Sequence, residues 1–235
     1  MSLLTICQDA CYETGVRAPT TIVGNSDSTA RQLLRLANRV GEEVSQDHAW
    51  QALVSEHTIT LVSGTQTYAL PSDIRWEVPD TTWNRTDNRR VINPLSASQW
   101  AREKGWSTIG GLELEARIKG NLFEIEETVG ASEDGDSIVF EYISNKWAQT
   151  ALSVAQHKFQ ADTDTCILCE ELITEGVVWR FKKAKGLDDW QKDESDFNRL
   201  KEKMKARDGG SRKISLGGLQ KDYILAVNVP DRGFG

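Results

Sequence analysis

The chain has 235 residues, of which 39% are hydrophobic and 27% charged, and its formal net charge is −7. This composition is typical of a folded soluble protein and excludes the disordered and fibrous classes. No apolar run approaches the about 20 residues of a membrane-spanning helix, and the opening MSLLTICQDAC lacks the basic flank of a signal peptide. We therefore expect a protein made in the cytoplasm, with no membrane partner and no need for a disulfide, metal or cofactor.

The first 50 residues predict two amphipathic helices. Ser2 can cap a helix with apolar residues at helical spacing that ends near Gly15. Ser26 to Ser28 offer caps for a second helix, with an apolar stripe that continues to about Trp50. The two helices should pack as a pair.

The middle of the chain, from about Gln51 to His157, changes to the period of two that is typical of strands. In LELEARI and LFEIEE the apolar residues alternate with charges, as half-buried antiparallel strands require. One helix is expected at 94–104. The expected strands are 55–61, 66–70, 74–78, 81–84, 112–118, 122–127 and 137–143.

Helical spacing returns after Asp162 and Asp164, in a stripe from Cys166 that ends at Gly186. A charged helix follows at 187–208. The last 27 residues could reach about 90 Å when extended, and they contain the apolar segment YILAVNV. Such a segment favours an arm that becomes ordered on a partner over a disordered tail.

These elements predict an α+β fold in which a four-helix bundle body carries an inserted antiparallel β domain and an extended C-terminal arm. The expected body comprises residues 1–50 and 159–208, the β domain residues 51–158, and the arm residues 209–235.

Charge is distributed unevenly between these parts. Residues 176–213 hold twelve Lys or Arg against seven Asp or Glu, whereas residues 111–141 hold nine acidic and two basic residues. A basic helical region and an acidic strand region should face different partners.

Four cysteines could in principle bind zinc, because the spacings of Cys7 with Cys11 and of Cys166 with Cys169 put each pair on one helix face. Both pairs lie in apolar stripes, whereas structural zinc sites usually wrap the ion with loops. We favour buried thiols in a helix interface and predict no metal site.

No enzyme motif is present. The sequence lacks GxSxG, GxxxxGK and GxGxxG, and His48, His57 and His157 stand in no metal-binding pattern. Glu124 and Glu126 could share a strand face as a glycosidase-like pair, but a solvated strand face explains them better. We predict a protein without catalytic residues.

The order of the sequence phrases resembles the head-to-tail adaptor family of tailed bacteriophages, also called tail tubular protein A or head-completion proteins. The phrases are, in chain order, STARQLLRLANRVGEEVSQDHAW, ITLVSGTQTYALPSDI, NPLSASQW, GDSIVFEYIS, DTDTCILCEELITEGVVWRFKKAKG and NVPDRG. This resemblance implies a structural virion protein at the head–tail junction, made in the host cytoplasm. It also implies a homo-oligomeric ring, usually of twelve copies, between the portal protein and a tail or nozzle protein.

The resemblance further implies that the C-terminal segment enters the portal, which would make it a strand added to the partner. The portal-binding residues would be Tyr223, Ile224, Leu225, Ala226, Val227 and Val229. Double-stranded DNA must slide through such a ring without sticking, so an acidic lumen is expected. The candidates for this acidic face are Glu113, Glu115, Glu124 and Glu126.

Two alternatives remain open. The tryptophans and acidic strands would also suit a tail-associated carbohydrate-binding or cell-wall-degrading protein. The basic segments RFKKAK and KEKMKAR would suit a DNA-packaging accessory protein, although acidic residues interrupt them.

Overall fold

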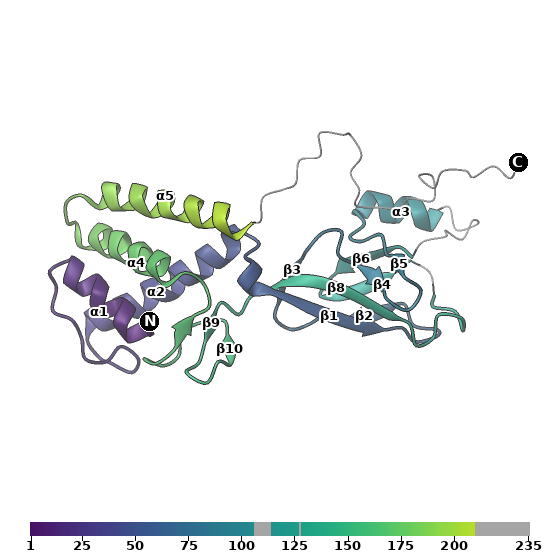
Figure 1. Cartoon of the computed structure of the whole chain (residues 1–235), viewed down its shortest axis with the longest axis horizontal. Helices are drawn as coiled ribbons and strands as arrows, with labels where there is room; N and C mark the ends of the chain where they lie inside the picture. Colours follow the sequence, from purple (N-terminus) through teal and green to yellow (C-terminus); the bar gives the residue numbers. More distant parts are fainter. Residues whose placement is uncertain (106–113, 127, 210–235) are drawn as a thin grey trace, which may run out of the picture.

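Helices gather at one end of the molecule and strands at the other (Figure 1). The structure is a computed structural model that describes residues 1–105, 114–126 and 128–209. Its described strands pair antiparallel in three sheets, and the mixture of helices with antiparallel sheets confirms the predicted α+β class. None of the described helices has the length and apolar character that crossing a membrane requires.

Four helices form the helical end: α1 (Leu3–Glu13), α2 (Ser28–Asp47), α4 (Glu170–Lys185) and α5 (Trp190–Asp208). The expected caps are present at two starts, since the side chains of Ser2 and Asp27 accept hydrogen bonds from the backbone of α1 and α2. Gly186 ends α4 with a φ of 67°, a left-handed conformation that glycine adopts without strain. Helix α4 contacts all three others, so the helices pack around α4.

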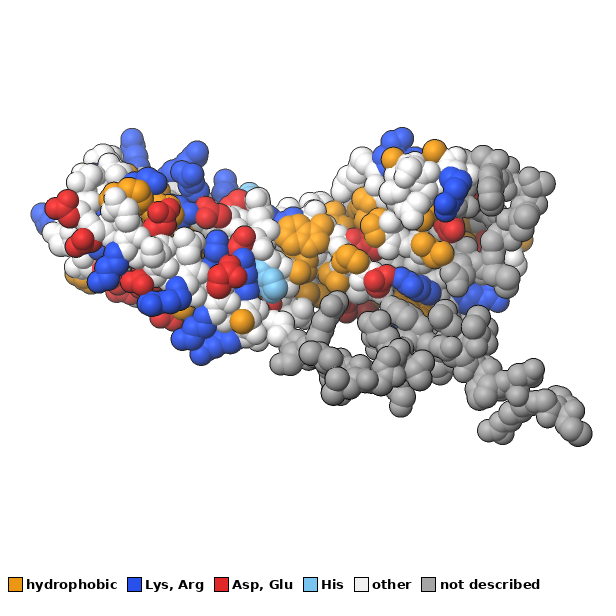
Figure 2. Space-filling model, turned by 90° about the horizontal axis from the view of Figure 1, so that it is seen from above, with side chains coloured by type: hydrophobic (Ala, Val, Ile, Leu, Met, Phe, Trp, Pro, Cys, Tyr) orange, Lys and Arg blue, Asp and Glu red, His pale blue; other side chains and the backbone are white. Residues whose placement is uncertain are grey.

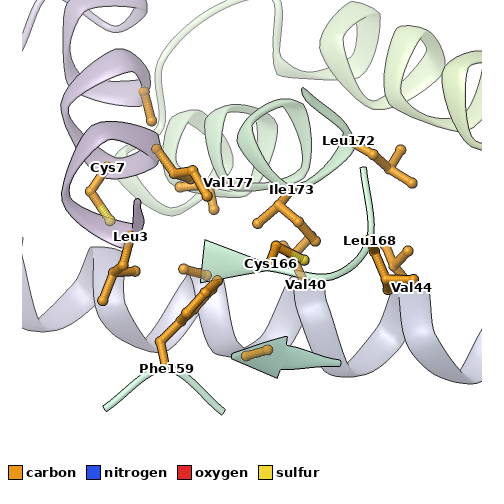
Figure 3. Packing of buried hydrophobic residues seen from close by; sticks show 14 of the residues in the cluster. Leu3, Cys7, Val40, Val44, Phe159, Cys166, Leu168, Leu172, Ile173 and Val177 are labelled. Atoms are coloured by element: carbon orange, nitrogen blue, oxygen red, sulfur yellow. The ribbon is translucent and has the colours of Figure 1, made fainter. Parts of the chain in front are cut away.

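The helical core is built mainly from apolar stripes. Val40 of α2 lies beside Ile173 of α4, and Val44 lies beside Leu168 (Figure 3). At Gly176 of α4 an added Cβ would come within 2.5 Å of Val40 and 3.0 Å of Phe197, so the missing side chain lets three helices meet closely.

The strand end is organised around β8 (Ser137–Ser144), which pairs with β1 (Val54–Thr60), β3 (Ile74–Glu77) and β4 (Trp83–Asn84). Strand β4 also pairs with β5 (Arg89–Arg90). A second sheet has the order β2-β7-β6, formed by Thr67–Ala69, Leu122–Ile125 and Ala116–Lys119. Helix α3 (Ala97–Gly105) lies at this end (Figure 1), and a 3-10 turn, Gln51–Leu53, precedes β1.

A second apolar cluster fills the strand end. Phe123 stacks on Phe140 with ring centroids 5.8 Å apart, and both side chains are fully buried. In β7 the alternation is as predicted, because Phe123 and Ile125 are buried whereas Leu122 is exposed. Strand β8 serves both clusters, since Phe140 lies in this one and Ile143 in the helical one.

A third sheet, in the order β10-β9-β11, consists of Ala155–Gln156, Ala148–Gln149 and Thr165–Cys166. Trp147 and Ala148, which the sequence pattern assigned to the β domain of residues 51–158, lie in the helical core together with Phe159 of the expected body. Trp147 and Phe159 meet edge to face, with centroids 4.9 Å apart. The segment around 147–159 therefore packs with the helices.

The prediction that a helix starts at Cys166 is wrong, because α4 begins at Glu170. Cys166 pairs with Ala148 in the third sheet, which holds its backbone extended. Asp164, expected near a helix start, instead accepts hydrogen bonds from the backbone of Gln160 and Ala161, at 2.6 and 2.8 Å. The extended pairing competes successfully with helix formation at this point.

Candidate assembly surfaces

The cysteines do not form the arrangement that the zinc alternative needs. Cys7 and Cys11 share a face of α1, but Cys166 lies in a strand and Cys169 caps α4. Burial raises the pKa of Cys7 and of Cys166 to about 12, which keeps both as thiols. Within the described ranges, no group of three or more His, Cys, Asp or Glu could hold a metal ion.

The histidines occupy structural positions. His48 meets Trp50 edge to face and lies 3.3 Å from Asp208, which connects the ends of α2 and α5. His57 contacts Phe140, and burial lowers the pKa of its imidazole. His157 is exposed beyond β10. The three lie on different elements and share no site.

Of the proposed acidic lumen residues, the described ones lie on the sheet of β6 and β7 or beside it. Glu124 is ion-paired with Arg117, with 2.6 Å between the guanidinium and the carboxylate. The guanidinium also covers the Trp100 ring at 4.2 Å. Glu115 and Glu126 are half-buried, and Glu113 lies outside the described residues. At Glu124, therefore, the negative charge is compensated within the chain.

The basic C-terminal helices are also largely compensated. Lys182 of α4 pairs with Asp193 at 2.6 Å, and Lys205 of α5 pairs with Asp47 of α2 at 2.6 Å. Lys183 lies over the Trp190 ring at 4.3 Å. These lysines hold helices together, which leaves less positive charge for DNA than the sequence suggested.

An uncharged hairpin carries two of the most exposed large apolar side chains of the described residues. Strands β9 and β10 are joined by a turn in which Ser153 has a φ of 60°. Leu152 is 87% exposed and Val154 is 61% exposed. The sequence pattern did not predict this hairpin. Exposed side chains of this size at one tip are a suitable contact for a partner protein.

Apolar side chains also gather where the two ends of the molecule meet, while charges of both signs cover the helices in the same view (Figure 2). Val54, Trp76 and Val78 come from the strand end and are only partly buried where they pack against the helical core. This junction is a second apolar surface that a neighbouring protein could cover.

The predicted arm residues, Tyr223 to Val229, lie outside the described part of the chain. For the rest, the structure defines an α+β protein whose notable surfaces suit protein contacts, and its described residues show no catalytic constellation.

A family model described as SU10 adaptor protein matches residues 1–218, and the chain belongs to this family of phage head–tail adaptors. The match confirms the resemblance found in the sequence phrases. The family is structural and not enzymatic, and its role implies contacts with portal and tail proteins in the virion. No curated protein matches the chain.

Proposed function

We propose that copies of this chain form a ring, of twelve subunits as in the proteins it resembles, that connects the capsid portal to the tail. Double-stranded DNA passes through the lumen during packaging and ejection. The observation that carries this proposal is the adaptor family match over residues 1–218. The exposed hairpin tip at Leu152 and the apolar junction around Trp76 support it, since a ring subunit needs contacts on several sides.

The arm is proposed to bind the portal through Tyr223 to Val229. Its apolar residues suit the addition of a strand to a partner sheet, where backbone hydrogen bonds give affinity and alternate side chains give specificity. The β end would then meet the tail or nozzle protein. The acidic residues Glu113, Glu115, Glu124 and Glu126 are proposed to face the lumen, and Glu124 is paired with Arg117.

The test uses the full chain and a purified portal ring, with native mass spectrometry of the mixture. The full chain should bind in ring stoichiometry, and a chain that ends at Asp208 should stay folded but bind about 100-fold more weakly or worse. A full chain that never binds the portal would contradict the adaptor function. A truncated chain that binds as well as the full one would exclude the arm.

Point variants separate the apolar segment from the length of the arm. Replacing Tyr223, Leu225 and Val227 with serine should reduce portal binding as strongly as the truncation does. Replacing the polar arm residues Ser215 and Gln220 with alanine is the matched control and should leave binding unchanged.

A further inference from the structure

Helix α2 presents a row of arginines on its outer side. Arg31, Arg35 and Arg39 are spaced by four residues and are all exposed. They lie on the side opposite Val40 and Val44, which pack on α4. Arg39, the last of the three, lines a groove that α2 shares with α4 and α5.

These three arginines differ from the acidic residues of the same helix in having no carboxylate partner among the described residues. Arg31 donates only to the backbone carbonyl of Asn25, at 3.4 Å. By contrast, the acids of α2 are neutralised by cations from other elements. The pairs are Glu42 with Arg75, Glu43 with Arg180, and Asp47 with Lys201 and Lys205. The outer face of α2 therefore keeps a net positive charge along its first three turns.

A groove between α1 and α4 has the opposite charge. Two carboxylates spaced by four come from α1, Asp9 and Glu13, and two more come from α4, Glu171 and Glu175. No ion pair within the described ranges involves any of the four. Tyr12, which is 69% exposed, lies beside them and adds an apolar surface.

Repulsion between carboxylates affects the pKa of Glu175 in this groove. Burial raises the pKa of its carboxyl, and the neighbouring carboxylates Glu13 and Asp193 raise it further. Met1 also lines the groove, but its amino group is paired with Glu170. The four other carboxylates keep a negative potential that a cation supplied by another molecule would relieve.

The two charged faces are separate parts of the surface, because no residue lines both the acidic groove and the groove at Arg39. Helix α4 turns Ile173 and Gly176 toward α2, whereas Glu171 and Glu175 lie on the other side of α4. The arginine row runs along α2 and ends at the groove that Arg39 lines with α4 and α5. Complementary patches at two different places on one subunit form a heterologous contact, which joins copies head to tail and closes into a ring when the rotation fits.

We propose that the arginine row of α2 in one subunit docks into the acidic α1–α4 groove of the next copy of this chain. This inference rests on the proposed ring and adds the residues of its subunit interface. Arg35 and Arg39 lie over the carboxylates, and the exposed Tyr12 ring provides a face on which a guanidinium can stack.

The test exchanges the charges of the two faces. One variant carries Arg35→Glu and Arg39→Glu, and the other carries Glu171→Lys and Glu175→Lys. Sedimentation velocity with the purified portal present measures assembly. Each variant alone should associate about 100-fold more weakly than the wild type, because like charges then meet at every contact. An equimolar mixture of the two variants should restore assembly, since each subunit then meets an oppositely charged neighbour.

A matched control carries Arg85→Glu and Arg199→Glu, which change the charge equally at exposed sites outside both faces. It should assemble like the wild type. Normal rings from either charge-reversed variant, or no rescue in the mixture, would overturn this interface while leaving the adaptor function intact. A wild-type chain that stays monomeric with portal would overturn both.

Discussion

The helical end and the strand end of the molecule stabilise their interiors by different means. The helical core is packed from long apolar stripes, and most of its ion pairs lie at the surface, as between Lys205 and Asp47. The exception is the buried Arg180, which pairs with the partly exposed Glu43. The strand end contains buried polar groups. Glu77 accepts hydrogen bonds from Thr82 and Asn93, and Asn84 donates to Asp136 at 2.8 Å.

The difference follows from element length. Helix α2 has 20 residues and can fix its position through a continuous stripe, whereas β4 and β5 have two residues each and contribute few ladder hydrogen bonds. Buried polar networks are directional, so they can specify how such short strands pair. A shared strand, β8, connects the two interiors.

The largest expected effect comes from removing one large ring from each core. Trp147→Ala should destabilise the helical core by about 3–5 kcal/mol, and Phe140→Ala should do the same for the strand core. Both side chains are fully buried. Urea unfolding, followed by circular dichroism and by hydrogen exchange of each part, measures both.

Because β8 contributes to both cores, each variant should lower the unfolding midpoint of the whole molecule in one transition. Two separate transitions, each sensitive to only one variant, would show that the two ends unfold independently despite the shared strand.

A smaller effect is expected from a single methyl group. In Gly41→Ala the new Cβ would lie 2.2 Å from the Trp147 ring, so the ring or α2 must move. We expect a net loss of about 1–3 kcal/mol. Gly130→Ala in the strand end is the control, because its Cβ would meet nothing closer than 3.6 Å. A Gly41 variant as stable as this control would mean that the indole adapts at no cost.

The sequence predicted the elements whose pattern is long. The stripe of α2 and the alternation in β7 are local, and the structure confirms both. The family was also recognisable from the order of the phrases. Of the short strands, β2 and β4 fall within the expected strands 66–70 and 81–84, whereas β9, β10 and β11 escaped prediction. Two residues such as Ala148 and Gln149 have no period of their own.

The start of α4 was predicted wrongly for a similar reason. Cys166 and Leu168 fit an apolar helical stripe as well as an extended segment, and the choice depends on Ala148, 18 positions away in sequence. The residues of the proposed subunit interface could not be predicted from the sequence either. The spacing of Arg31, Arg35 and Arg39 can be read from the sequence, but their lack of partners depends on Arg75 and Arg180 neutralising Glu42 and Glu43.

The smallest expected effect is a difference in pH dependence between the two ends. Burial raises the pKa of Glu77 above its ordinary value, despite hydrogen bonds from Thr82 and Asn93 that lower it. A carboxyl with a raised pKa stabilises the fold when protonated, so its contribution is complete below about pH 4.3 and is lost as the pH rises through its folded pKa. Glu77→Gln should remove this dependence from the free energy of unfolding.

Asp47 in the helical end should act in the opposite direction. Burial alone would raise the pKa of its carboxyl, but hydrogen bonds from Lys205 and Lys201 bring it below the ordinary value. Its contribution is therefore complete above about pH 3.9 and is lost as the pH falls through the folded pKa. For this partly exposed pair the loss should be about 1 kcal/mol or less, and Asp47→Asn should abolish it. Urea midpoints of both variants and the wild type between neutral pH and pH 3 measure this. If both variants changed the pH profile in the same direction, the contrast between a buried carboxyl in one end and a surface ion pair in the other would be wrong.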